Sequence, residues 1–174
     1  MTSIDPSSGG GPADLRLRAP EHRVAPRAIL WWSLQALIGW LVVTLPQAGL
    51  LLFTDDAPIG AMWALWACVT VGVLHVAIMP SWRYRVHRWE VAADAVYTQT
   101  GWLTQEWRVA PASRIQTVDA KRGPLQQLLG LSTVTVTTAS AAGPLHIEGL
   151  EHQLAATLVE ELTATTQAVP GDAT

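Results

Sequence analysis

Two long apolar runs without a charged residue fill much of the N-terminal half of the chain. Residues 28–53 number about 26, and a helix of that length rises roughly 39 Å at 1.5 Å per residue. Residues 58–79 would rise roughly 33 Å in the same way, and the hydrocarbon layer of a bilayer is about 30 Å thick. The sequence therefore predicts two membrane-spanning helices, joined by residues 54–57.

A secretory signal and a soluble core are the two alternatives to membrane spans for these apolar runs. A cleaved secretory signal has an apolar region of only about 7–15 residues, whereas the first run is longer and a second run follows it. Burial of both runs inside a soluble core would need a large protein around them. The chain has only 174 residues, of which 49% are hydrophobic and 14% charged. Length and composition thus favour a membrane protein.

The arginines give the predicted helices an orientation. Four arginines precede the first run and three follow the second, whereas the link of residues 54–57 carries two aspartates and no base. Basic residues near the ends of spanning helices are retained on the cytoplasmic side. We therefore predict a two-pass membrane protein, with its N-terminus and its C-terminus both in the cytoplasm.

The other segments complete the predicted organisation. Residues 1–27 begin with a stretch rich in Gly, Ser and Pro, and are predicted to be a disordered cytoplasmic tail. Residues 28–80 form the predicted hairpin, residues 81–166 a cytoplasmic domain, and residues 167–174 a flexible end. Residues 89–169 hold four basic and eight acidic residues, and this acidity disfavours nucleic acid as a partner.

The domain segment has the alternation that is typical of strands. Alternating or β-branched stretches predict strands at residues 82–91, 96–99, 102–109, 114–118, 133–138 and 145–148. Residues 123–130 predict a short helix, with proline at its first position and glycine at its end. Leucine at every fourth position predicts a closing amphipathic helix: Leu150, Leu154, Leu158 and Leu162. The expected fold is α+β, a two-helix transmembrane hairpin followed by a mainly-β barrel or curved sheet with a C-terminal capping helix.

Several motifs of the domain segment stand in a distinctive order. They are Gly101-Trp102-Leu103, Val109, Arg114-Ile115-Gln116-Thr117-Val118, Gly123-Pro124-Leu125-Gln126, Leu129-Gly130-Leu131, Thr135-Val136 and residues 147–150. In order and spacing, these motifs and the apolar pair before them resemble the bacterial pleckstrin-homology-like membrane proteins of the YdbS-like type, over residues 28–166. The resemblance implies a pleckstrin-homology-like barrel tethered to the cytoplasmic leaflet of the bacterial inner (plasma) membrane, and it transfers no catalytic residue.

Three arginines directly after the second run are candidate contacts for lipid headgroups: Arg83, Arg85 and Arg88. A base close to an anionic bilayer surface contributes about 1 kcal/mol of attraction. The alternative is that these arginines only orient the helices.

The densest polar stretch of the domain is a predicted partner-binding loop, formed by Arg114, Gln116, Asp119, Lys121 and Arg122. The alternative is structural, with Arg114 paired to an acid across the sheet and Asp119 capping the short helix. His75 is a further candidate, because an ionisable residue inside an apolar run is costly in lipid. It could instead reach water near the interface.

The sequence contains no nucleotide-binding loop, no metal-ligand spacing and no nucleophile motif. We therefore expect no catalytic residues, cofactor, metal or small-molecule substrate, so the protein is not expected to be an enzyme. The expected function is a protein-interaction or oligomerisation module on a membrane anchor. Its expected partners are the lipids that hold the anchor, and a second protein or further copies of the chain. The alternative function is sensing of anionic lipid through the juxtamembrane arginines.

Protease protection tests the predicted topology. A tag fused at Thr174 should survive protease added outside sealed spheroplasts, because the C-terminus is expected in the cytoplasm. A cysteine at Asp55 should react with a membrane-impermeant thiol reagent under the same conditions. Digestion of the tag from outside would refute the topology.

Overall fold

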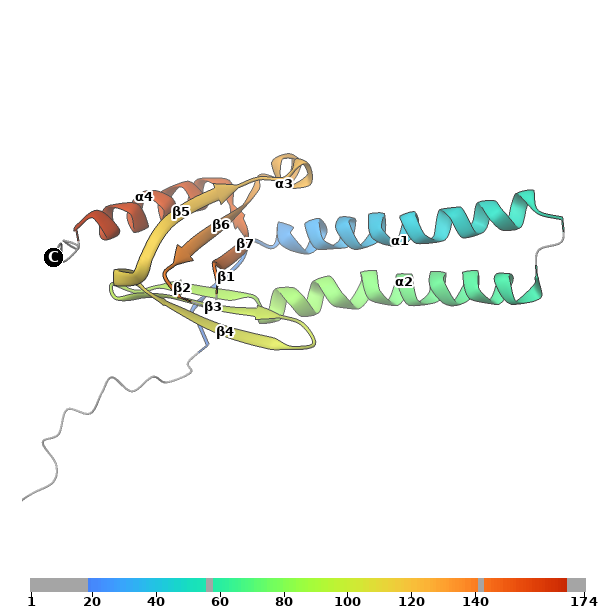
Figure 1. Ribbon diagram of the computed structural model, residues 1–174, viewed down its shortest axis with the longest axis horizontal. Helices are drawn as coiled ribbons and strands as arrows, with labels where there is room; N and C mark the ends of the chain where they lie inside the picture. Colours follow the sequence, from blue (N-terminus) through green and yellow to red (C-terminus); the bar gives the residue numbers. More distant parts are fainter. Residues whose placement is uncertain (1–18, 56–57, 141–142, 169–174) are drawn as a thin grey trace, which may run out of the picture.

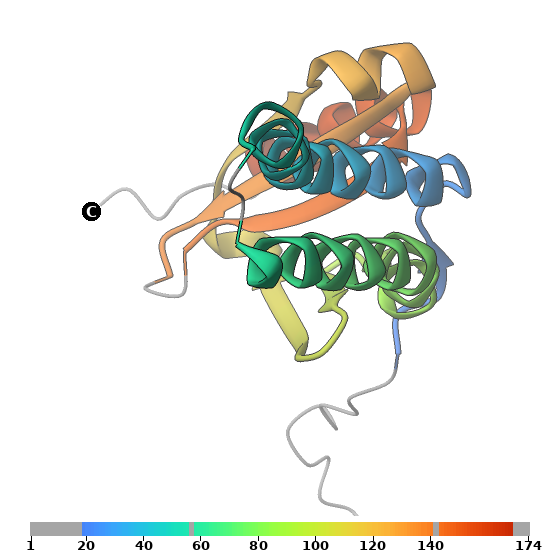
Figure 2. The ribbon, with the colours of Figure 1, turned by 90° about the vertical axis from the view of Figure 1, so that its right-hand side faces the viewer.

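A long helical hairpin carries a β-rich domain at one end in the computed structural model, which describes residues 19–55, 58–140 and 143–168 (Figure 1). Helix α1 covers Arg27–Phe53, and helix α2 covers Ile59–Val86. The two helices run antiparallel and pack against each other, as the view along the hairpin also shows (Figure 2). Pro46 lies inside α1 without ending it.

Between their arginine-bearing ends, both long helices are apolar around their whole circumference. The most hydrophobic stretch of α1 has 0% of its residues buried within the protein, and that of α2 has 6% buried. A core helix of a soluble protein would bury its apolar side chains instead. The arrangement is incompatible with the soluble-core alternative, and α1 and α2 are two candidate membrane-spanning helices.

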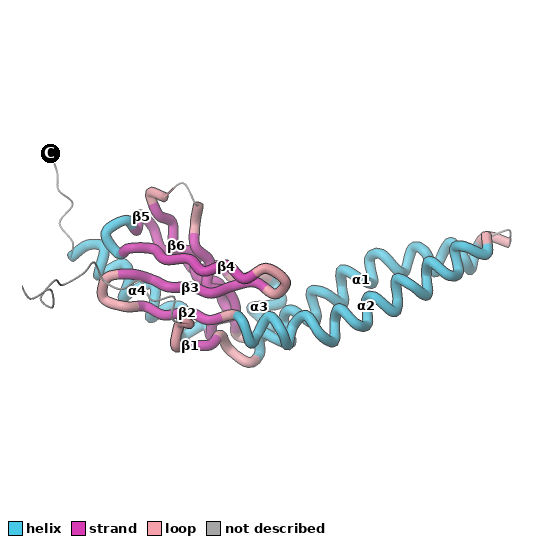
Figure 3. The backbone as a smooth tube through the Cα atoms, turned by 90° about the horizontal axis from the view of Figure 1, so that it is seen from below, coloured by secondary structure: helices cyan, strands magenta, loops and turns pink. Residues whose placement is uncertain are grey.

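The domain consists of two antiparallel sheets and two helices. The first sheet has the order β1-β2-β3-β4, formed by His22–Arg23, Arg88–Val91, Ala95–Gly101 and Gln105–Pro111 (Figure 3). The second sheet has the order β5-β6-β7, formed by Ile115–Lys121, Leu131–Thr138 and Leu145–Glu151. Helix α3, Pro124–Leu129, connects β5 to β6, and helix α4, His152–Ala168, follows β7.

The core lies between the two sheets and α4. Along β6, Val134 and Val136 are fully buried, and Thr135 between them is only partly buried on the opposite face. Helix α4 adds Ala155, Leu158 and Leu162 to the same cluster. The predicted architecture of a helical hairpin, a mainly-β domain and a C-terminal helix is confirmed.

The strand predicted at residues 82–91 is wrong over its first half. Helix α2 continues to Val86, and β2 begins only at Arg88. The alternation of apolar and basic residues here also suits a helix end, because Tyr84 packs against the domain core and Arg85 stays exposed. Basic residues in a last helical turn interact favourably with the helix dipole.

The predicted disordered tail is also wrong where it meets α1. His22 pairs with Trp89 of β2, Val24 is 3% exposed, and the Ala25 amide donates to the Gly149 carbonyl at 2.9 Å. This short strand is held by a partner far along the chain, which no local pattern reveals. Residues 1–18 of the predicted tail lie outside the described residues, as do 169–174 of the predicted flexible end, and α4 extends to Ala168.

Gly149 allows β7 to approach the first turn of α1. Its φ is +74°, and a Cβ added to it would lie 2.7 Å from the Cβ of Ala28. Both the left-handed backbone and the close approach therefore favour glycine at this position.

Replacing this glycine should loosen the contact between hairpin and domain. We expect Gly149→Ala to destabilise the protein by about 1–3 kcal/mol from crowding, in addition to the cost of its positive φ. Gly143→Ala is the matched control, because Gly143 has a φ of +78° with nothing within 4 Å of an added Cβ. Thermal unfolding of both variants in detergent separates the two effects, and equal losses would contradict the crowding.

Candidate functional site

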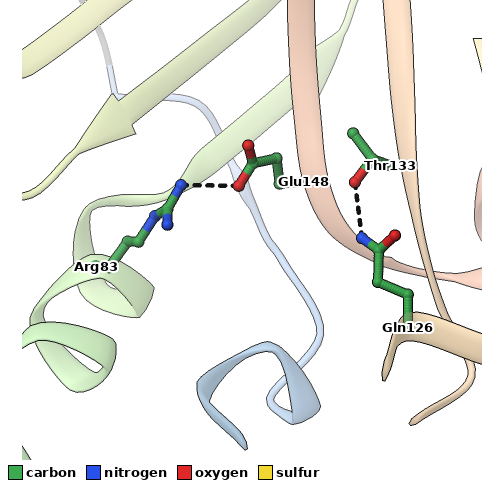
Figure 4. Close-up of polar contacts among 4 residues, drawn as sticks. All are labelled: Arg83, Gln126, Thr133 and Glu148. Atoms are coloured by element: carbon green, nitrogen blue, oxygen red, sulfur yellow. Dashed lines mark hydrogen bonds and ion pairs between the residues drawn. The ribbon is translucent and has the colours of Figure 1, made fainter. Parts of the chain in front are cut away.

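Arg83 ties the end of α2 to the domain. Its Nη2 donates to the Glu148 Oε2 of β7 at 2.8 Å, and both side chains are partly buried (Figure 4). Its guanidinium also lies over the indole of Trp32, with 4.7 Å between Cζ and the ring centroid. Arg83 thus joins α1, α2 and β7 at one point, which we call the joint.

His87 lies buried beside the joint, directly after α2. Its ring meets the Trp32 ring edge-on at 5.0 Å between centroids, and its Nδ1 has no hydrogen-bond partner in the described part of the chain. Burial is the main cause that lowers the pKa of His87 from 6.5 to about 4, and the positive charge of Arg83 contributes to this shift in the same direction. The imidazole is therefore neutral at physiological pH.

A cavity of about 230 Å³ opens between the joint and the first sheet. Its lining is Arg83, His87, Thr98, Thr100, Gly101, Glu106, Arg108, His146 and Glu148. The basic and acidic groups are matched, because Arg83 pairs with Glu148, and Arg108 lies 3.5 Å from Glu106. Within residues 19–55, 58–140 and 143–168, no group of three His, Cys, Asp or Glu side chains could hold a metal ion.

The predicted headgroup arginines do not form one group. Arg83 is held at the joint, and Arg88 donates from Nη1 to the Pro20 carbonyl at 3.4 Å. Arg85 is exposed on the last turn of α2. A contact with anionic headgroups stays a prediction, and it depends mainly on Arg85.

The predicted partner loop is a strand rather than a loop. Four of its residues are exposed on β5 or just before it, and we call them the β5 surface: Arg114, Gln116, Asp119 and Lys121. The fifth residue, Arg122, serves the fold, because its Nε donates to the Leu131 carbonyl at 3.1 Å.

The structural alternative for this stretch is not realised. The N-cap residue of helix α3 is Gly123, whose amide donates to the Gln126 Oε1 at 2.9 Å, so Asp119 does not cap this helix. Gln126 in turn donates to Thr133 of β6 at 2.8 Å (Figure 4). Arg114 makes no ion pair with any residue that the structure describes.

His75 connects three elements inside the apolar part of the hairpin. The Trp40 Nε1 of α1 donates to its Nδ1 at 3.1 Å, so this imidazole carries its proton on Nε2 when neutral. On another side its ring meets that of Trp102, at 5.7 Å between centroids. Trp102 lies between β3 and β4, far from α2 in the sequence. Its ring contact with His75 could therefore not be predicted from the sequence.

Comparisons with known proteins match this chain over both the helical hairpin and the domain. The profile of the family described as "Bacterial PH domain" matches residues 36–166. The chain is also similar to the UPF0699 transmembrane protein YdbS of Bacillus subtilis (strain 168), with 30% identity over 129 residues, 70% of this chain and 78% of that protein. No solved structure matches the chain significantly. The matched region includes most of the helical hairpin as well as the domain, and the resemblance seen in the sequence motifs is confirmed.

His87 should make the stability of the protein depend on pH. The unfolded chain binds a proton near pH 6.5 at this residue, whereas the folded chain does so only near pH 4. The contribution of His87 to the free energy of unfolding should therefore be fully present above pH 6.5. It should be lost as the pH falls toward 4, a loss on the order of 3 kcal/mol. Denaturant titrations in detergent across this window should show a flatter profile for His87→Phe. His146→Gln is the control and should keep the slope, and equal slopes for wild type and His87→Phe would contradict the assignment.

Proposed function

The chain belongs to the bacterial PH domain family, and on this premise we propose that it is a membrane-anchored interaction module at the cytoplasmic face of the bacterial plasma membrane. It is a membrane protein with two candidate membrane-spanning helices. The family is not known as catalytic, so the proposal is binding rather than a reaction. The observation that carries it is the exposed β5 surface on a domain that is fixed to its anchor.

The joint supports the first half of the proposal, a fixed domain. Arg83 bonds to β7, and the backbone of Ala25 bonds to the same strand at Gly149. Trp32 of α1 is 1% exposed within the domain core. A domain held at these points presents the same face in the same direction on every copy of the protein.

The outward face of β5 supports the second half, a binding surface. Asp119 stands opposite Thr135, and Lys121 opposite Thr133, on the side of the sheet that faces away from the buried valines. Asp119 and Lys121 have opposite charges and lie two residues apart on one face. Such a pair is self-complementary across a twofold axis, where Asp119 of one chain meets Lys121 of another. We therefore propose a second copy of the chain as the partner.

The proposed location rests on charge. Arg27, Arg83 and Arg85 lie where the helices meet the domain, whereas Asp55 lies at the far end of the hairpin. Retention of basic flanks in the cytoplasm would place the domain on that side.

Lipid sensing is the weaker proposal for the same domain. Two of the three arginines expected to meet headgroups bond within the protein. One exposed base contributes about 1 kcal/mol at an anionic surface, which is too little for selective recognition.

Charge reversal on β5 tests the proposed self-association. Asp119→Lys and Lys121→Asp should each weaken it roughly tenfold, because each places like charges opposite each other at two symmetric positions. The double swap, Asp119→Lys with Lys121→Asp, should restore it. Energy transfer between donor- and acceptor-labelled full-length chains in vesicles measures the association.

Glu160→Lys is the matched control, since Glu160 is exposed and lies on α4 rather than on β5. It should leave the association unchanged. A swapped chain that associates no better than the single variants would mean that Asp119 of one copy does not meet Lys121 of the other. Unchanged association in both single charge-reversal variants and in the double swap would exclude the β5 surface as the interface.

A further inference from the structure

Two parts of the domain reach furthest along the helical hairpin. One is the turn of residues 101–104 between β3 and β4, which lies beside α2, and the other is α3, near the start of α1 (Figures 1 and 3). Neither segment contains a charged residue, although the domain around them is acidic. The two segments therefore flank the helices on the side of the domain that faces the bilayer.

The turn reaches the level of the apolar part of α2. Trp102 meets His75 at 5.7 Å between ring centroids. His75 precedes Met79, the last residue of the uncharged run, by four positions, so it lies roughly 6 Å inside that run at 1.5 Å per residue. A side chain of the domain thus lies beside a helical segment that is expected to be surrounded by lipid.

Both projecting segments also expose a leucine almost completely. Leu103 follows Trp102 and is 80% exposed, and Leu128 of α3 is 83% exposed. The other leucines of α3, Leu125 and Leu129, pack against the core. Single exposed leucines are ordinary on a protein surface. Here, however, each of the two segments that project along the membrane-spanning helices carries one.

Exposed tryptophans indicate where the bilayer surface lies. Trp63 is 73% exposed near the far end of α2, and Trp82 is 48% exposed near the domain. They are separated by 19 positions, which corresponds to roughly 29 Å along a helix, close to the thickness of the hydrocarbon layer. Tryptophan favours both membrane interfaces, so His75 and Trp102 lie on the bilayer side of the interface marked by Trp82.

We infer that the β3–β4 turn and α3 insert into the leaflet next to the domain, so that the domain touches the bilayer on both sides of its anchor. The ligand is the boundary between headgroups and acyl chains, and Trp102, Leu103 and Leu128 are the inserted side chains. This contact does not depend on the β5 surface, so either proposal can fail without the other.

Site-specific labelling of the full-length chain in nanodiscs tests the insertion. In a Cys68→Ala background, Leu103→Cys and Leu128→Cys each carry an environment-sensitive fluorophore, and Lys121→Cys on β5 is the matched exposed control. We expect spin-labelled acyl chains to quench the labels at positions 103 and 128 several-fold more than the label at 121. Aqueous iodide should show the reverse order.

Nanodiscs that hold one chain each exclude burial by a second copy. Quenching of all three labels by iodide alone would overturn the inference. So would labels at 103 and 128 that are shielded from iodide yet unaffected by the lipid quencher, because a protein surface would then cover these leucines. Quenching by lipid at only one of the two positions would overturn the two-sided contact.

Discussion

The first two turns of α1 belong to two structures at once. Ala28, Trp31 and Trp32 are residues of a helix that leads into the hairpin, and all three are buried in the core of the β-rich domain. A domain that shares core side chains with its anchor cannot rotate about that anchor without exposing them to water. The orientation of the domain is therefore set by packing rather than by a linker, and the joint at Arg83 and the contact at Gly149 reinforce it.

Patterns that repeat along the chain predicted most of the fold. The uncharged runs, the alternation of Val134 and Val136 with threonine, and the Gly-Pro-Leu start of α3 are local signals, and each corresponds to an element. The failures occur where a distant segment decides the structure. His22 is in a strand because Trp89 pairs with it, and residues 82–86 are helical because α2 packs on the domain there. Neither contact leaves a mark in the surrounding sequence.

In the candidate site too, local sequence predicted some features, whereas contacts with distant segments decided the others. Composition identified the exposed stretch on β5, whereas it could not show that the Arg122 side chain donates to the Leu131 carbonyl while the Lys121 side chain is exposed. The spacing of the three arginines after the second apolar run predicts that they act together. Their roles differ because Glu148 and Pro20 each approach a different one from elsewhere in the chain. The joint itself, with the neutral His87, required the tertiary structure.

The pairing of β1 with β2 makes the helical hairpin an insertion between two neighbouring strands of one sheet. On the ribosome, β1 is made before the hairpin and β2 after it, so the first strand has no partner until both helices have been synthesised. Completion of the first sheet thus follows synthesis of the hairpin, and a fragment that starts at residue 81 lacks an edge strand. Strand pairs so distant in sequence close slowly, so the pairing of β1 with β2 is a late step in the folding of the domain.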